Sequence, residues 1–286
     1  PEKERRLSNI NIRQGIDGIG IDIPLLNRQI SFLEECLFEV DKTLPWIVEG
    51  RAPTSPIGLA EWCRKEGIPC PPTKEEDEEA YDEWESTYSP KYPWVAQISN
   101  RRSVNKALTG LKTVRTRLRP DGTMGFAMKY FGGHTGRFSG DAGFNVQNLK
   151  KIPLLFGQNR LPITNEDVIK TLCDRYDEEG VWRDSSGQEV FDVDARKILI
   201  PRNPAKNKFV MCDLSQIEPR VLAWLAGYEE LLAIFRSGKD AYAAFGAQMF
   251  GIPGMTKDTH PDLRQSAKSA LLGCGYGLGW ASFAAQ

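Results

Sequence analysis

An apolar run that ends abruptly at an acidic residue constrains the fold of this chain most. Residues 208–215 read KFVMCDLS, and IEPRVLAWLAG follows after Gln216. The first pattern predicts a strand that ends near Asp213, and the second predicts a helix that closes at Gly227. A carboxylate there, beside a backbone carbonyl such as that of Leu214, is a good oxygen site for Mg²⁺. An isolated aspartate in this position is more often a helix cap, so its interpretation depends on the rest of the sequence.

Helical patterns lie on both sides of this strand and helix. They cover residues 24–42, 55–67, the acidic stretch 74–85, 99–115 and 228–286. Between them, Pro-Asp-Gly at 120–122 predicts the turn of a hairpin, and the polar stretch 154–195 predicts an irregular surface insertion. We therefore predict an α+β fold with a sheet in the middle and helices before and after it.

The composition is that of an ordinary globular protein. The 286 residues are 41% hydrophobic and 26% charged, and this length predicts two or three subdomains. No apolar run approaches the ~20 residues that span a bilayer, and the first residues show no signal-peptide pattern. The six cysteines form no Cys-x-x-Cys pair, which argues against a zinc site or a disulfide framework and fits a reducing cytosol.

Charge is distributed unevenly, although the formal net charge is only -1. The stretch from residue 101 to 120 has seven basic residues and no acid: Arg101, Arg102, Lys106, Lys112, Arg115, Arg117 and Arg119. Such a run indicates either contacts to phosphate or a solvated helix face. If Lys112 and Arg115 contact phosphate, their joint removal would flatten the salt dependence of DNA binding by roughly two units. The acidic stretch 74–85 is interpreted as a solvated face.

The segment LRQSAKSALLGCGYGLG, residues 263–279, places cations on one face of a predicted helix. Arg264, Lys268 and Leu272 recur every four residues, and Tyr276 continues the face with some rotation. Two cations on one face can grip a triphosphate, and a lysine also suits a leaving pyrophosphate. The alternative is a solvated cationic stripe. The glycines at 273, 275 and 277 weaken that alternative, because they destabilise a helix unless a base or backbone approaches closely.

The segment HTGRFSGDAGFNVQNLKKIP, residues 134–153, is polar and loop-like. It carries Arg137 and three amide side chains, those of Asn145, Gln147 and Asn148. Arginine and amide groups suit the acceptors of a DNA minor groove, although an ordinary glycine- and asparagine-rich loop has the same composition.

Taken together and in this order, the segments resemble the family A DNA polymerases. DLSQIEPR resembles their motif A, RQSAKSALLGCGYG their motif B, TGRFS…NVQN their primer–template segment, SGKDAYAAFGAQMFG the fingers segment between motifs A and B, and INIRQGIDGIGIDIPLL the start of the thumb in phage members. The resemblance implies a partial right-hand polymerase fold. Its parts would be a thumb over 1–118, a partial palm over 119–224 and fingers over 225–286. It also implies action in the cytoplasm of a host cell.

The same resemblance implies a role for each matching residue. Asp213 would bind both Mg²⁺ ions of a complete enzyme with help from the Leu214 carbonyl, and Glu218 would lie under the incoming sugar and exclude a 2′-hydroxyl. Arg264 and Lys268 would hold the triphosphate, and Lys268 could donate a proton to pyrophosphate. Further nucleotide contacts would come from Gln216, Tyr242, Leu272 and Tyr276, the last beside the templating base. Arg137 would touch the minor groove near the primer end. The charge and amide patterns described above, independently of the resemblance, add Gln147, Asn148, Lys106, Lys112 and Arg115 as candidate contacts to primer–template DNA.

Three departures from the family pattern affect what we expect. Leu272 replaces the usual Phe or Tyr, which weakens stacking on the nucleotide, and Tyr242 replaces a His that contacts phosphate in bacterial members. No His-Asp-Glu of motif C, which supplies the second metal-binding aspartate, follows before Gln286. We therefore expect no polymerase activity from the isolated chain, because one carboxylate holds two metal ions poorly.

Three alternatives remain open from the sequence. The chain could be a DNA-binding or structural fragment without catalysis, or one half of a split polymerase completed by a C-terminal fragment. It could also belong to a single-subunit RNA polymerase, although Glu218 argues against that. We find no Asp-x-Glu exonuclease site, and Asp17 and Asp22 are interpreted as turn and cap residues.

Overall fold

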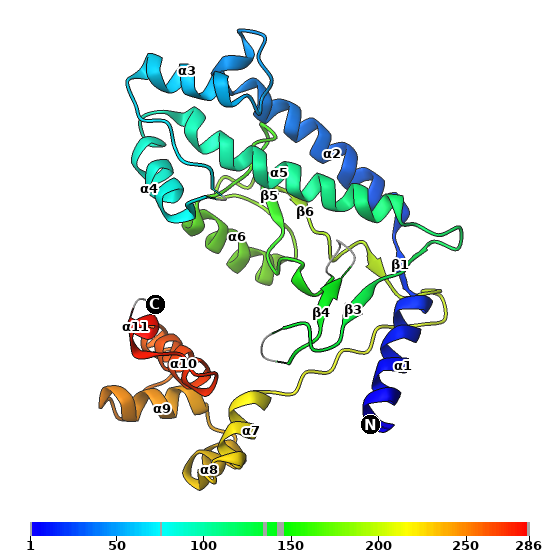
Figure 1. The fold of residues 1–286 in the computed structure, drawn as a ribbon, viewed down its shortest axis with the longest axis vertical. Coiled ribbons are helices and arrows are strands. Elements are labelled where there is room, and N and C mark those ends of the chain that lie inside the picture. Colours follow the sequence, from blue (N-terminus) through cyan, green and yellow to red (C-terminus); the bar gives the residue numbers. More distant parts are fainter. Residues whose placement is uncertain (1, 75, 134–135, 142–145, 285–286) are drawn as a thin grey trace. The chain divides into compact units, whose positions relative to one another are not determined.

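The computed structural model describes residues 2–74, 76–133, 136–141 and 146–284 (Figure 1). The chain forms two compact units, Pro1–Phe209 and Val210–Gln286. Helices alternate with small antiparallel sheets, so the predicted α+β class is confirmed. The division into thumb, palm and fingers stays a prediction. Among the helices of the described residues, none combines the length and apolar character needed to cross a membrane.

Two long helices, α2 (Ile23–Lys42) and α5 (Pro93–Thr116), pack side by side in the first unit (Figure 1). α2 begins where expected, because the Asp22 carboxylate accepts the N–H of Leu25 at 2.9 Å. The cap assignment of Asp22 is thus confirmed, whereas Asp17 is the last residue of a helix, α1 (Glu2–Asp17), that the sequence analysis missed.

Shorter helices complete this helical region. α3 (Pro56–Glu66) lies within the helical pattern predicted over 55–67. It begins after Ser55, whose hydroxyl accepts the N–H of Gly58, and ends at Gly67 in the left-handed conformation. The short 3₁₀ helix η1 (Pro45–Ile47) precedes it, and α4 (Glu78–Tyr88) follows it. α4 buries Tyr81 and Trp84 and exposes most of its acids, which confirms a solvated acidic face.

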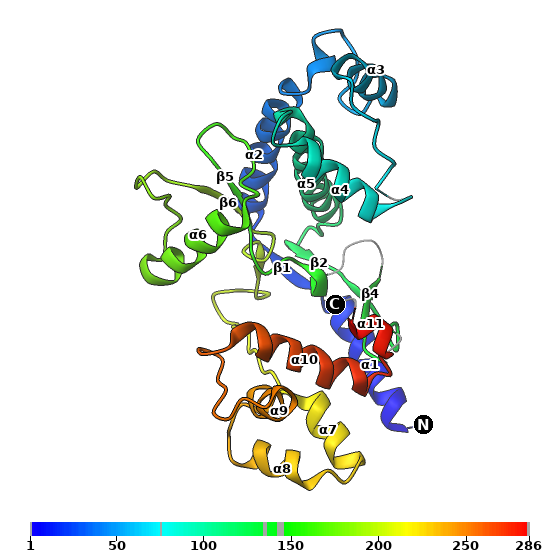
Figure 2. The ribbon, with the colours of Figure 1, turned by 90° about the vertical axis from the view of Figure 1, so that its left-hand side faces the viewer.

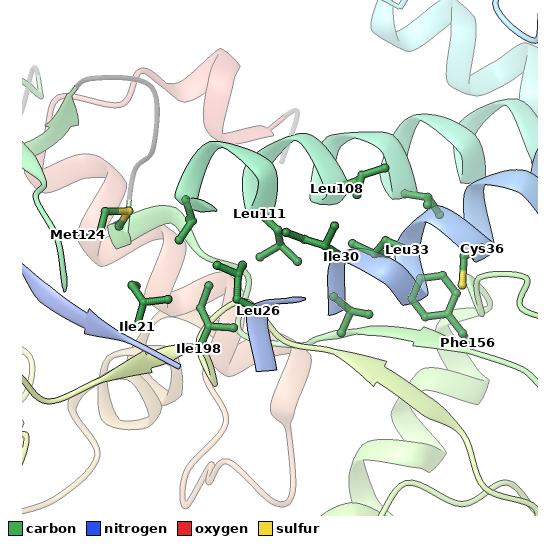
Figure 3. Close-up of a cluster of buried hydrophobic side chains, with 13 residues drawn as sticks. Ile21, Leu26, Ile30, Leu33, Cys36, Leu108, Leu111, Met124, Phe156 and Ile198 are labelled. Atoms are coloured by element: carbon green, nitrogen blue, oxygen red, sulfur yellow. The ribbon is translucent and has the colours of Figure 1, made fainter. Parts of the chain in front are cut away.

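The main hydrophobic core of the first unit lies between α2, α5 and the nearby strands (Figure 3). Leu26, Ile30 and Leu33 project from one face of α2 toward Leu108 and Leu111 of α5. This i, i+4, i+7 spacing is the pattern that predicted the helix. The strand residues Ile21, Met124 and Phe156 close the same cluster, together with Ile198 in the turn just before β7.

The central sheet joins segments that are far apart in the sequence. β1 (Ile19–Ile21) pairs antiparallel with β2 (Thr123–Met124) on one side and β7 (Leu199–Ile200) on the other. A second pair joins β3 (Ala127–Lys129) to β4 (Ser139–Asp141), and η2 (Val146–Asn148) follows. The predicted turn at 120–122 forms. Instead of the predicted hairpin, however, only a single bridge joins Leu118 to Met124, because β2 forms its hydrogen-bonded ladder with β1.

The stretch 154–195 contains regular secondary structure, so the expected irregular structure is wrong, whereas its being an insertion stays a prediction. β5 (Leu154–Phe156) pairs with β6 (Phe191–Val193), and α6 (Glu166–Glu179) lies between them in the chain (Figure 1). Its small core consists of Leu155, Leu172, Trp182 and Val190. The Tyr176 and Trp182 rings stack at 4.2 Å. The sequence analysis missed α6 because the stretch is so polar. The helix nevertheless follows ordinary helix rules: it is capped by Asn165, ends at Gly180 and buries Leu172.

The second unit is helical, as predicted for residues 228–286. Its helices are α7 (Ile217–Leu225), α8 (Glu229–Arg236), α9 (Ala241–Phe250), α10 (Pro261–Gly275) and α11 (Trp280–Ala284). α10 packs against α9 and α7 (Figure 2). The hydrophobic core of the second unit includes Ala223, Leu231, Phe235 and Ala241, and Leu271 of α10 packs against them.

The strand predicted over 208–215 does not form. Residues 207–214 have neither helix nor strand, and Val210 and Met211 are 93% and 92% exposed. A strand needs a neighbour to pair its N–H and C=O groups, and none of the described residues forms a ladder with this segment. The apolar residues give this segment a preference for the extended state without giving it a partner.

Candidate functional site

The face of α10 carries the residues that the sequence placed there. Arg264, Lys268 and Leu272 all lie within the helix, each at least partly shielded from solvent. Tyr276 is the first residue after the helix and is exposed. Ala267 and Ala270 are buried on the inner side of the same helix.

Helix α9 brings Tyr242 next to both cations of α10. The Arg264 Cζ atom lies 5.4 Å from the centre of the Tyr242 ring, and the Lys268 Nζ atom lies 6.0 Å from it. Both distances allow a cation–π attraction. The Tyr242 ring is buried, and burial raises the pKa of its hydroxyl although Arg264 opposes the shift. Three predicted nucleotide-binding residues thus come together.

Asp240, which the sequence analysis did not single out, holds this group in place. Its Oδ2 atom accepts a hydrogen bond from Arg264 Nε at 2.6 Å, and its Oδ1 atom accepts the N–H groups of Tyr242 and Ala243. Burial tends to raise the pKa of Asp240, but the Arg264 hydrogen bond, the Arg264 charge and the two backbone N–H groups together hold it below the usual range. The carboxylate therefore stays charged at neutral pH.

Asp213 lies just before α7, in the exposed segment described above. The Leu214 carbonyl accepts the N–H of Ile217 at 3.2 Å, and Gln216 adopts the left-handed conformation as α7 begins. Arg220 Nε donates to the Ser215 carbonyl at 2.9 Å. This turn fixes the chain between Asp213 and α7, and Glu218 lies in the first turn of that helix.

Close packing joins the end of α10 to α7. A Cβ atom added at Gly275 would come within 2.7 Å of the Cδ2 atom of Leu222 in α7, and one at Gly273 would meet the Leu278 side chain. Gly273 and Gly275 therefore have a packing reason, whereas Gly277 has open space around it and adopts the left-handed conformation that favours glycine. The same packing brings the segment that resembles motif A against the segment that resembles motif B.

The residues expected to bind Mg²⁺ do not form a complete site among the described residues. Among the described residues, no group of three His, Cys, Asp or Glu side chains could hold a metal ion. Asp213 and the Leu214 carbonyl offer one carboxylate and one neutral oxygen, which is fewer ligands than a two-ion site requires.

The structure brings two of the predicted DNA-binding residues together. Lys106 of α5 and Asn148 at the end of η2 line one cleft of about 290 Å³, with Lys150 beside them. Apolar residues from α5 and from the stretch 149–154 also line it.

The remaining DNA candidates differ in their surroundings. Arg115 and Arg137 are exposed, whereas the Lys112 Nζ atom lies 2.7 Å from Glu34 Oε1. Arg101, in the same basic run, pairs with Asp41 at 2.6 Å. The Gln147 side chain, together with Asn145, lies outside the described residues. The run is therefore partly a set of internal ion pairs, a third possibility that the sequence analysis did not consider.

Comparisons with known proteins agree with the resemblance of these segments to family A DNA polymerases. The sequence model of DNA polymerase family A matches residues 66–286. The chain belongs to DNA polymerase family A. It is 28% identical over 279 residues to the DNA polymerase of Bacillus phage SP02, an alignment that covers 96% of this chain and 40% of the phage protein. A thermostable DNA polymerase I of Thermus thermophilus is 44% identical over 69 residues, or 24% of this chain and 8% of that polymerase.

A solved structure shares the fold. The polymerase domain of Pol1 from M. smegmatis, solved in complex with DNA primer–template and dNTP, has a TM-score of 0.56 at 20% identity. The similarity covers 94% of this chain and 41% of that one. Almost the whole of this chain is matched in both comparisons, but it spans only about two fifths of the phage polymerase and of the mycobacterial polymerase domain.

Proposed function

We propose that this chain contributes the nucleotide-binding part of a template-directed DNA polymerase. The observation that carries the proposal is the packing of α10, with Arg264 and Lys268, on α9 and α7, the helix that follows Asp213. Its substrates would be deoxynucleoside triphosphates and primer–template DNA, and for a phage protein the place of action would be the host cytoplasm.

In this reaction the primer 3′-oxygen attacks the α-phosphate of the bound nucleotide. A bond forms between the 3′-oxygen and the α-phosphorus as the bond between the α-phosphorus and the oxygen bridging to the β-phosphate breaks, and the 3′-hydroxyl proton passes to solvent. Arg264 and Lys268 offset the negative charge on the departing pyrophosphate, and Lys268 can protonate it. Glu218 would exclude a ribose 2′-hydroxyl, and Tyr276 would lie beside the templating base.

Mg²⁺ would screen the phosphates and activate the attacking oxygen in the complete enzyme. Asp213 would be one of its ligands. We propose that a second carboxylate comes from a C-terminal polymerase segment outside these 286 residues. Without that carboxylate the chain would be inactive by itself.

Lys106, Asn148, Arg115 and Arg137 would contact the DNA. Their basic and amide groups suit phosphates and minor-groove acceptors. This part of the proposal is supported by the shared cleft of Lys106 and Asn148.

Primer extension tests the proposal. The purified chain is assayed with deoxy- and ribonucleotides, with and without a second polypeptide carrying the C-terminal part of a family A palm. We expect template-dependent extension with deoxynucleotides only when the second polypeptide is present, and its loss in Lys268→Ala and Asp213→Ala. DNA binding without extension in every mixture would favour a non-catalytic fragment, and efficient use of ribonucleotides would favour an RNA polymerase.

A further inference from the structure

The ion pair between Asp240 and Arg264 joins the start of one helix to the cationic face of another. We propose that Asp240 is a positioning residue that orients Arg264 toward the phosphates of the incoming nucleotide. The inference rests on the proposed nucleotide site and adds a residue to it.

The two oxygens of Asp240 have different partners. Oδ1 accepts the backbone N–H groups of Tyr242 and Ala243, at 3.0 and 3.2 Å, and so fixes the carboxylate to the first turn of α9. Oδ2 accepts the Nε–H of Arg264 at 2.6 Å. Because the carboxylate cannot turn without losing its backbone contacts, it fixes the direction of the guanidinium group.

The contact also leaves the useful end of the guanidinium for another anion. Nε is the inner donor of the planar group, and the terminal Nη1 and Nη2 groups carry the remaining donors. The Tyr242 ring lies 5.4 Å from Arg264 Cζ and restricts the group further. An arginine held through Nε and against a ring loses less freedom when its outer donors bind phosphate.

Burial separates this ion pair from an ordinary surface pair. The side chains of Arg264 and Asp240 are 19% and 33% exposed. Arg236 and Glu229, in the same unit, lie 2.9 Å apart but are 65% and 71% exposed. Exposed pairs of that kind contribute little, so Glu229 provides a matched control.

The test compares Asp240→Asn, Arg264→Ala, their double variant, Lys268→Ala and Glu229→Gln in the full chain. Asparagine keeps an oxygen that can cap α9, but it replaces the charged acceptor that faces Arg264 with an NH₂ group. Binding of deoxyadenosine triphosphate and of the monophosphate is measured by displacement of a fluorescent triphosphate, and thermal unfolding is followed in parallel. We expect Asp240→Asn to weaken triphosphate binding about fivefold, with monophosphate binding and the unfolding temperature nearly unchanged.

The double variant decides whether Asp240 acts through Arg264. In the Arg264→Ala background, Asp240→Asn should have no further effect, and Glu229→Gln should match the parent throughout. If Arg264→Ala weakens triphosphate binding while Asp240→Asn leaves or strengthens it, Asp240 is only a helix cap and the inference fails alone. If neither Arg264→Ala nor Lys268→Ala changes triphosphate binding, the proposed nucleotide site fails and the inference with it.

Discussion

Helices α5 and α10 both carry cations that suit phosphate, but their cations have different surroundings. In α5, Arg101 and Lys112 form ion pairs with carboxylates of α2, Asp41 and Glu34. In α10, no described carboxylate lies within ion-pair distance of Lys268. Its ammonium group lies over the ring of Tyr242 instead.

The difference shows that the number of basic residues does not measure the charge available to a ligand. A lysine already bound to a carboxylate gains less from a phosphate, since the first contact must be broken or shared. The basic run 101–119 has more basic residues than the α10 face, yet two of them, Arg101 and Lys112, form ion pairs between α5 and α2. We therefore expect the greatest loss of ligand binding from α10.

Removal of Lys268 should have the largest effect. Lys268→Ala should weaken triphosphate binding about tenfold or more, because the lysine has no competing carboxylate among the described residues. Equilibrium titration with a deoxynucleoside triphosphate measures the loss. Lys257, an exposed lysine just before α10, is the matched control. Equal losses in Lys257→Ala and Lys268→Ala would mean that only the overall charge of this unit matters.

Changes at Leu272 should have a smaller effect, because this residue adds no charge. It lies one turn beyond Lys268 and is partly buried. An aromatic side chain there could stack on the nucleotide, so Leu272→Phe or Leu272→Tyr should change nucleotide affinity and the deoxy-to-dideoxy preference by about tenfold or less. Single-nucleotide incorporation by the completed polymerase measures both quantities.

Leu272→Met, which keeps the flexible apolar character, is the control for that experiment. DNA affinity should stay the same in all three variants. If the aromatic variants match the parent on both kinds of nucleotide, Leu272 is a packing residue and the α10 face is turned away from the sugar.

Arg115 and Lys112 should differ in their effect on DNA binding, although both belong to the same basic run. Arg115 is exposed, whereas Lys112 is paired with Glu34. Arg115→Ala should therefore reduce the slope of log affinity against log salt by about one, and Lys112→Ala by much less. The joint loss should be closer to one unit than to the two expected from sequence. Equal changes for both variants would show that the Glu34 pair opens when DNA binds.

Local rules explain which parts of the fold could be predicted. Asp22 and Ser55 cap helices that the sequence pattern predicted, and Gly67 ends α3 in the left-handed conformation, which glycine adopts more readily than other residues. The α10 face was also predictable, because residues four apart on a helix must share a face. Each of these features depends on residues within one or two turns.

Features that depend on distant partners could not be predicted in this way. The run KFVMCD has the composition of a strand, but a strand also requires a neighbouring chain segment. In the candidate site, Asp240 and Arg264 are 24 positions apart, and nothing in either segment indicates the pairing. α6 was a different kind of miss, since its helix signals were present and were outweighed by its polarity.

The smallest effect should come from Glu34, and it tests whether the carboxylate really withholds Lys112 from DNA. Glu34→Gln removes the negative partner and leaves the lysine in place. We expect the salt slope to become steeper by at most one unit and DNA affinity at low salt to rise about twofold, because Lys112 becomes available to phosphate. Filter binding over a salt series measures both.

The pH dependence of the same variant provides an independent check. The Lys112 hydrogen bond, together with the Lys112 charge, holds the pKa of Glu34 below its usual value. A lowered carboxylate pKa means that the pair stabilises the fold above the pKa of the unfolded chain, and that this stabilisation is lost as the pH falls through the folded pKa. The parent and Glu34→Gln should therefore differ in unfolding temperature near neutral pH and converge in acid, where Glu34 is protonated. A difference that persists unchanged in acid would show that the substitution acts through packing, and the contrast between a paired α5 and an available α10 would lose its electrostatic basis.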